Sequence, residues 1–158
     1  MYHTLEEFLQ DWNYESNGTQ KILDALTDDS LSQAVAPGHR TLGELAWHVV
    51  TSLHLFLSSA GLEFEGANGE EVPTSAKEMA DSYRSTSENL VSAIKAQWND
   101  GTLKEIKEVF GQQMPAAVVL GMMNTHQIHH RGQLTILMRQ AGLRIPGVYG
   151  PSKEEWGA

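Results

Sequence analysis

The sequence contains no cysteine among its 158 residues. Disulfide bonds, thiolate metal ligands and cysteine nucleophiles are therefore excluded together. No apolar run approaches the roughly 18 residues that a membrane-spanning helix needs. The N-terminus also lacks the basic region and apolar core of a signal peptide. We therefore expect a soluble, cytoplasmic protein without a membrane partner.

Basic side chains are scarce as well. Eleven Lys and Arg stand against 20 Asp and Glu, which gives a formal net charge of -9. An acidic chain without a basic cluster binds nucleic acid poorly, because contacts to phosphate supply most of the non-specific affinity. Gly-rich phosphate loops and the Gly-x-Ser-x-Gly turn of hydrolases are also missing. We therefore expect no nucleic-acid partner, nucleotide site or hydrolase triad.

The sequence predicts one all-α domain over residues 1–158. Thr4, Thr41 and Ser75 each precede an acidic residue by three positions, which is the capping box that begins a helix. Pro115 suits the first turn of a fourth helix. Helix ends are expected before three glycines, namely Gly61, Gly101 and Gly142. Between these signals the apolar residues recur at helical spacing, and no segment alternates like a strand, so we predict a four-helix bundle.

Histidine is the unusual component, with seven residues. His126 and His130 are four positions apart, so on a helix both imidazoles can reach one metal ion. They interrupt an apolar stripe formed by Val119, Met122, Leu134 and Leu137. This placement predicts that the two histidines replace core residues, where an unpaired imidazole is costly. His129 is expected outside the stripe.

A third ligand is expected from another helix, and His48 lies within the most apolar one. A site of His48, His126 and His130 suits Zn, Ni, Fe or Cu better than Ca or Mg, and it leaves a coordination position open. The spacing also allows satisfied core histidines or a surface pair without metal. Gln127 stands where helical zinc peptidases carry their general base, which disfavours peptidase activity.

Three further residues have more than one interpretation. Glu44 serves the capping box or orients His48. Arg131 is solvated, paired with a glutamate, or in contact with an anionic substrate. Gly132 in mid-helix indicates close packing or room for a substrate. No catalytic residue is assigned.

Three segments resemble the DinB family: residues 41–48, 126–134 and 149–152. The resemblance implies an up-up-down-down four-helix bundle, usually a homodimer, and a divalent metal on three histidines. Those histidines fall on His48, His126 and His130, with Ni or Zn expected first and Fe or Mn as alternatives. Some relatives are damage-inducible. Others, such as bacillithiol S-transferases and mycothiol-dependent maleylpyruvate isomerase, use the metal to activate a low-molecular-weight thiol.

Three functional hypotheses follow. The first is a metal-dependent thiol transferase whose partners are a small-molecule thiol and an electrophile that enters between the second and fourth helices. The second is a non-catalytic metal-binding protein of the stress or damage response. The third is a metal-free bundle that acts as an interaction module.

Overall fold

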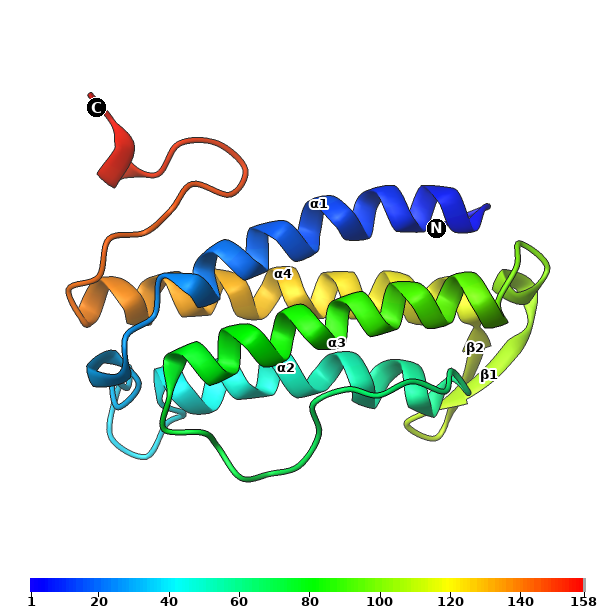
Figure 1. The fold of residues 1–158 in the computed structure, drawn as a ribbon, viewed down its shortest axis with the longest axis horizontal. Helices are drawn as coiled ribbons and strands as arrows, with labels where there is room; N and C mark the ends of the chain where they lie inside the picture. The colour runs from blue at the N-terminus through cyan, green and yellow to red at the C-terminus, as the bar shows by residue number, and fades with distance from the viewer. Residues whose placement is uncertain (158) are drawn as a thin grey trace.

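The computed structural model describes residues 1–157, which form a long helical bundle with a small sheet at one end (Figure 1). The α-helices are α1 (Leu5–Asp24), α2 (Leu42–Ser59), α3 (Ala76–Gln97) and α4 (Ala116–Gln140). The strands are β1 (Ile106–Val109) and β2 (Gln112–Pro115). Short 3-10 turns cover Asp28–Ser30, Thr102–Lys104 and Lys153–Glu155. None of the helices in the described residues is long and apolar enough to cross a membrane.

The predicted helix starts are in place. Thr4 and Thr41 form complete capping boxes, and the Ser75 hydroxyl accepts a hydrogen bond from the backbone of the third helical residue. Pro115 is the N-cap residue of α4, one position before the helix begins. Local capping chemistry therefore sets the starts of α1, α2 and α3, whereas α4 begins after Pro115 without a side-chain cap.

Two of the three predicted glycine stops are confirmed. Gly61 and Gly142 have φ of +86° and +79° just beyond the caps of α2 and α4. Gly101 was expected to end α3, and this prediction is wrong: α3 ends at Gln97, and Gly101 has φ of -66°. Its backbone N–H instead donates to the Asn99 side chain at 2.8 Å, within a turn that follows the helix.

The bundle differs from the expected up-up-down-down order, because α1 and α4 run one way while α2 and α3 run the other (Figure 1). Asn124 and Arg131 of α4 donate to Asp11 and Glu15 of α1 in the same order along both helices, as parallel neighbours do. The parallel pair α2 and α3 needs a connection that returns along the bundle, and residues 60–75 make it.

The purely all-α prediction is wrong at residues 106–115, where β1 and β2 pair antiparallel. The register opposes Val109 to Gln112, so Phe110 and Gly111 alone form the turn, with φ of +53° and +75°. The usual marker of such a turn is Asn-Gly, and Phe-Gly does not announce it. The Phe110 ring packs edge-on against Phe56 of α2, with ring centroids 5.2 Å apart, which holds the hairpin on the bundle.

The core fills the space between all four helices, and α2 contributes the most continuously buried face. Trp12, Trp47 and Trp98 are buried. On α4 the predicted stripe is partly wrong, since Met122 is 37% exposed and Met123 is buried in its place. The buried face of α4 is therefore rotated slightly, which moves His126 and His130 from the core to its border.

Candidate metal centre

The structure brings together the three histidines that the spacing predicted. α2 and α4 are antiparallel neighbours, and they place His48 opposite His126 and His130, which lie one turn apart on α4. The Nε2 atom of His48 lies 3.0 Å from that of His126 and 3.2 Å from that of His130, and the last two are 3.1 Å apart. All three residues are partly buried, so neighbouring side chains restrain the cluster while part of it stays accessible to solvent.

This donor set fits a divalent cation. Metal–nitrogen bonds of about 2.0–2.1 Å place two nitrogens on one ion about 2.9 Å apart at a right angle and about 3.4 Å apart at the tetrahedral angle. The observed separations of 3.0 to 3.2 Å lie within that interval. Three imidazoles can therefore hold an ion and leave further coordination positions open.

Gln133 fixes the orientation of one imidazole, and sequence analysis missed it. Nδ1 of His130 lies 2.7 Å from Oε1 of Gln133, an oxygen that only accepts. Nδ1 must carry the proton in this hydrogen bond, so Nε2 keeps its lone pair toward the cluster. The spacing of three residues on one helix was the available signal.

We predict that Gln133→Leu lowers metal affinity about 10- to 100-fold, the usual cost of removing such an orienting partner. The measurement is a competition titration against a chromophoric chelator. Gln140→Leu is the matched control, because Gln140 is exposed at the end of the same helix. Equal affinities of the two variants would contradict the orienting role.

The environment keeps these imidazoles neutral. Burial lowers the pKa of His48 and of His126 to about 4, and it also lowers the pKa of His130. The positive charge of Arg40 and the neighbouring histidines lower these pKa values further. Since only neutral imidazole binds a metal ion, the cluster is in its binding form at neutral pH.

Without metal, stability is predicted to fall as the pH drops below 6.5. Histidines of the unfolded chain take up protons near pH 6.5, whereas folded His48 and His126 do so near pH 4. Unfolding therefore takes up protons between these values, so the folded state is favoured fully above 6.5 and progressively less below it. Thermal unfolding in chelator between pH 7 and about 4.5 measures this effect, and carboxylates begin to titrate below that range. The stability of His126→Leu should depend less steeply on pH than that of the wild type. An unchanged pH dependence would refute the attribution of this effect to the clustered histidines.

Two hollows flank the cluster where α2 and α4 meet. The His130 hollow has a volume of about 440 Å³ and is lined by Val35, His39, Arg40, Leu45, His130, Gln133, Ile136 and Leu137. The His126 hollow has a volume of about 530 Å³ and is lined by Met1, Phe56, Ala117, Val118, Gly121, Met122, Thr125 and His126. Neither lining includes an acidic side chain. The cluster thus lies between two spaces of small-molecule size.

Gln127 points away from the cluster. Its Nε2 donates to the Val49 carbonyl at 2.9 Å and to the Ser52 hydroxyl at 3.0 Å, and its Oε1 accepts from the Tyr83 hydroxyl at 3.2 Å. All its hydrogen bonds are within the core. The residue at the position of the peptidase base is therefore a packing element that ties α4 to α2 and α3.

Arg131 is paired with a glutamate, which was one of the three interpretations, and the other two are wrong. Arg131 is 3% exposed, and its guanidinium forms an ion pair with Glu15 at 2.5 Å. It also donates to the Glu15 carbonyl at 2.8 Å, to the Thr19 hydroxyl at 3.1 Å and to Tyr149. Tyr149 lies in the segment resembling the DinB tail, so this network fixes the C-terminal tail to α1 and α4.

The remaining candidates lie outside the cluster. His129 is exposed, as predicted, although the centroid of its ring lies 4.8 Å from that of the His130 ring. The Glu44 carboxylate accepts from the Thr41 backbone at 2.6 Å, which is its capping role. A Cβ on Gly132 would meet nothing within 4 Å, so close packing does not account for this glycine.

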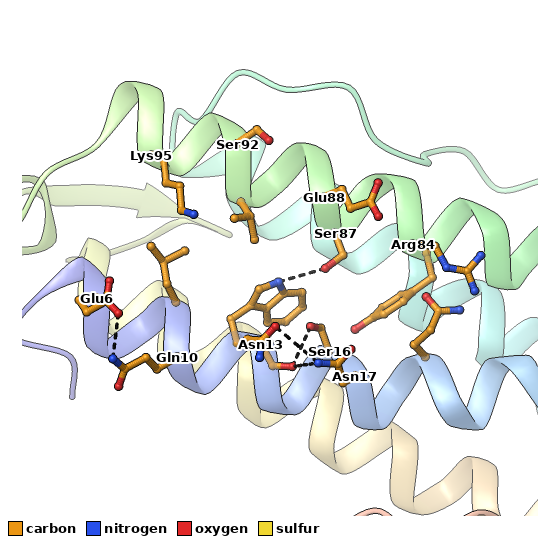
Figure 2. Close-up of a pocket in the computed structure, with 15 residues that line it drawn as sticks. Glu6, Gln10, Asn13, Ser16, Asn17, Arg84, Ser87, Glu88, Ser92 and Lys95 are labelled. Atoms are coloured by element: carbon orange, nitrogen blue, oxygen red, sulfur yellow. Dashed lines mark hydrogen bonds between the residues drawn. The ribbon is translucent and has the colours of Figure 1, made fainter.

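A larger groove of about 800 Å³ lies between α1 and α3 and contains none of these histidines (Figure 2). Its polar side chains bond mostly to one another or to neighbouring carboxylates. Gln10 donates to Glu6 at 2.8 Å, Asn17 to the Asn13 carbonyl at 2.7 Å, and buried Trp12 to Ser87 at 3.1 Å. This mutual pairing marks the groove as a surface between two helices, and it offers no cluster of metal ligands among the described residues.

Comparison with known proteins agrees with the sequence motifs. The model of the DinB family matches residues 1–158. The uncharacterized protein YrdA of Bacillus subtilis is 49% identical over 157 residues, which cover 99% of this chain and 94% of that protein. The B. subtilis protein YjoA is 24% identical over 130 residues, covering 80% and 83% of the two chains.

Two solved structures share the fold. The crystal structure of a DinB-like protein from Bacillus cereus has a TM-score of 0.92 at 54% identity, covering 94% of this chain and all of that one. The structure of the DinB-like protein YjoA from B. subtilis has a TM-score of 0.68 at 24% identity, covering 86% and 92% of the two chains, and it supports the fold alone.

Proposed function

Because this chain belongs to the DinB family, we propose that it is a metal-dependent transferase that joins a low-molecular-weight thiol to a small electrophile. The observation that carries the proposal is the three-histidine cluster, open toward a hollow on each side. A transfer reaction has two reactants, and the two hollows give each reactant its own approach to one centre. His48, His126 and His130 would hold the ion, with Ni or Zn expected first.

A divalent ion on three neutral imidazoles supplies a Lewis acid with open positions, which lowers the pKa of a thiol that reaches it. The absence of cysteine agrees with this chemistry, since the thiol would then come from a cosubstrate. The protein's own part is to direct the lone pairs of three Nε2 atoms toward one point, and Gln133 orients His130 for this purpose.

The overall reaction balances as a substitution. The thiol sulfur forms a bond to carbon of the electrophile, the bond from that carbon to its leaving group breaks, and the leaving group departs with the electron pair. The thiol proton goes to bulk water, because neither hollow is lined by a carboxylate that would accept it. The apolar side chains Phe56 and Met122 offer a surface for an uncharged electrophile on the His126 side.

The proposal is tested by metal analysis followed by a thiol-transfer screen. Tag-free protein should contain about one divalent ion per chain. The metal-loaded protein should then accelerate conjugation of bacterial thiols to a model electrophile, with the rate lost after chelation and restored by the metal. Bound metal without turnover toward any thiol tested would instead favour the second hypothesis, a non-catalytic protein of the stress or damage response.

Absence of metal even after dialysis against Zn and Ni would overturn both hypotheses and leave the interaction module. The homodimer remains a prediction of the family resemblance, and the elution volume of the purified protein with light scattering tests it.

A further inference from the structure

Arg40 is a cation without a carboxylate partner at the His130 hollow. Arg84, Arg131 and Arg139 each form an ion pair, whereas Arg40 and Arg144 form none within residues 1–157, and of these two only Arg40 lines the His130 hollow. The chain has 20 acidic residues and a net charge of -9, yet none of those acids lines this hollow. An unneutralised guanidinium here is therefore a local exception to the charge of the molecule.

The loop that carries Arg40 is fixed to the bundle. Thr41 pairs with Ala34 in an isolated β-bridge, and the backbone N–H of Leu42 donates to the Gln33 carbonyl at 2.7 Å. Arg40 is thus anchored next to the first turn of α2. Its charge also contributes to the lowered pKa of each of the three clustered histidines, which agrees with its position close to them.

Gln133, which lines the same hollow, also offers a hydrogen-bond donor. Its Oε1 is already engaged by Nδ1 of His130. The amide NH₂ therefore remains for a ligand. Guanidinium and amide N–H groups together suit an anion that accepts several hydrogen bonds, and carboxylate is the organic group that Arg recognises in a two-pronged manner.

The rim of the hollow is apolar. Val35 is 57% exposed and Ile136 is 53% exposed, and both line the same space as Arg40. A short hydrocarbon body would cover these two side chains and gain from their burial. The volume of about 440 Å³ lies in the range of small-ligand pockets.

We propose that the His130 hollow binds a small organic carboxylate, with its charged end on Arg40 and Gln133 and its hydrocarbon part over Val35 and Ile136. This assignment rests on the proposed function, and it means that one of the two reactants is an anion. The other reactant then enters on the His126 side, where the lining carries no Lys or Arg side chain and His126 is neutral.

The test compares two probes of nearly equal shape, pentanoate and pentanamide. Both are titrated into the protein as purified, and binding is followed by two-dimensional NMR of the backbone amides. Pentanoate should shift the amide signals around Arg40 and Gln133 and bind about tenfold more tightly than pentanamide, as expected for a charge-assisted hydrogen bond. Arg40→Gln should abolish that preference. Arg144→Gln, which removes an arginine lining a different surface hollow, should preserve it.

Equal affinities of the two probes for the wild-type protein would overturn the proposal. A preference that survives in Arg40→Gln would also overturn it, because the carboxylate would then be drawn by the metal centre itself. These outcomes are distinct from failure of the proposed function, which is measured by metal content and thiol turnover. A protein that binds pentanoate through Arg40 but conjugates no thiol would keep the anion site and lose the transferase.

Discussion

Replacing His126 by Ala is expected to leave the protein without its metal. Nε2 of His126 lies 3.0 Å and 3.1 Å from the other two donors, and within residues 1–157 these three histidines form the one such group of potential ligands. Loss of an outer orienting group alone typically costs about 10–100-fold in metal affinity, and loss of a direct ligand should cost more. Elemental mass spectrometry of tag-free protein should show the content falling from about one ion per chain to a trace.

His129→Ala is the matched control for this result. His129 lies on the same turn of α4, and its ring contacts that of His130, but it is exposed and outside the cluster. The control should retain its metal. If both variants keep the ion, or if both lose it, the assignment of the ligands to this cluster is wrong. His48→Ala should behave like His126→Ala, because the ligand set spans two helices.

Much of the candidate site follows from local rules. A separation of four residues places His126 and His130 on one helical face whatever the rest of the fold does. The capping boxes at Thr4 and Thr41 likewise depend on nearby residues, and they start α1 and α2 as predicted. The choice of His48 rested on its apolar surroundings, and the packing of α2 against α4 places its Nε2 within 3.2 Å of those of His126 and His130.

Several of the parts that were missed depend on contacts distant in sequence. Helix directions are set by which faces meet, and helical periodicity alone does not encode them. Arg40 belongs to a loop whose place beside α4 is decided by its bonds to α2 and to itself. Met122 and Met123 are adjacent and equally apolar, so only the rotation of α4 decides which is buried. Motif spacing and apolar context therefore found the three clustered histidines, while the lining of the hollows required the structure.

The second large effect is expected at Arg131, one residue after a candidate metal ligand. Arg131→Met should lower the free energy of unfolding by about 3–5 kcal/mol, because it leaves the buried Glu15 carboxylate without its partner. Arg139→Met should cost less than about 1 kcal/mol, since the ion pair of Arg139 with Glu154 is more exposed to solvent. Urea denaturation of both variants measures the difference.

The double variant Arg131→Met with Glu15→Leu separates charge burial from packing. Replacing both members of a buried pair by apolar groups is often neutral or stabilising, so the double variant should recover much of the stability lost in Arg131→Met. If it recovers none, the network with Thr19 and Tyr149 contributes mainly by anchoring the tail, and the uncompensated charge is not the cause. The metal centre should be unaffected by these substitutions, because adjacent residues on a helix face different directions. His130 faces α2 while Arg131 faces α1, so the metal content of the folded double variant should match that of the wild type.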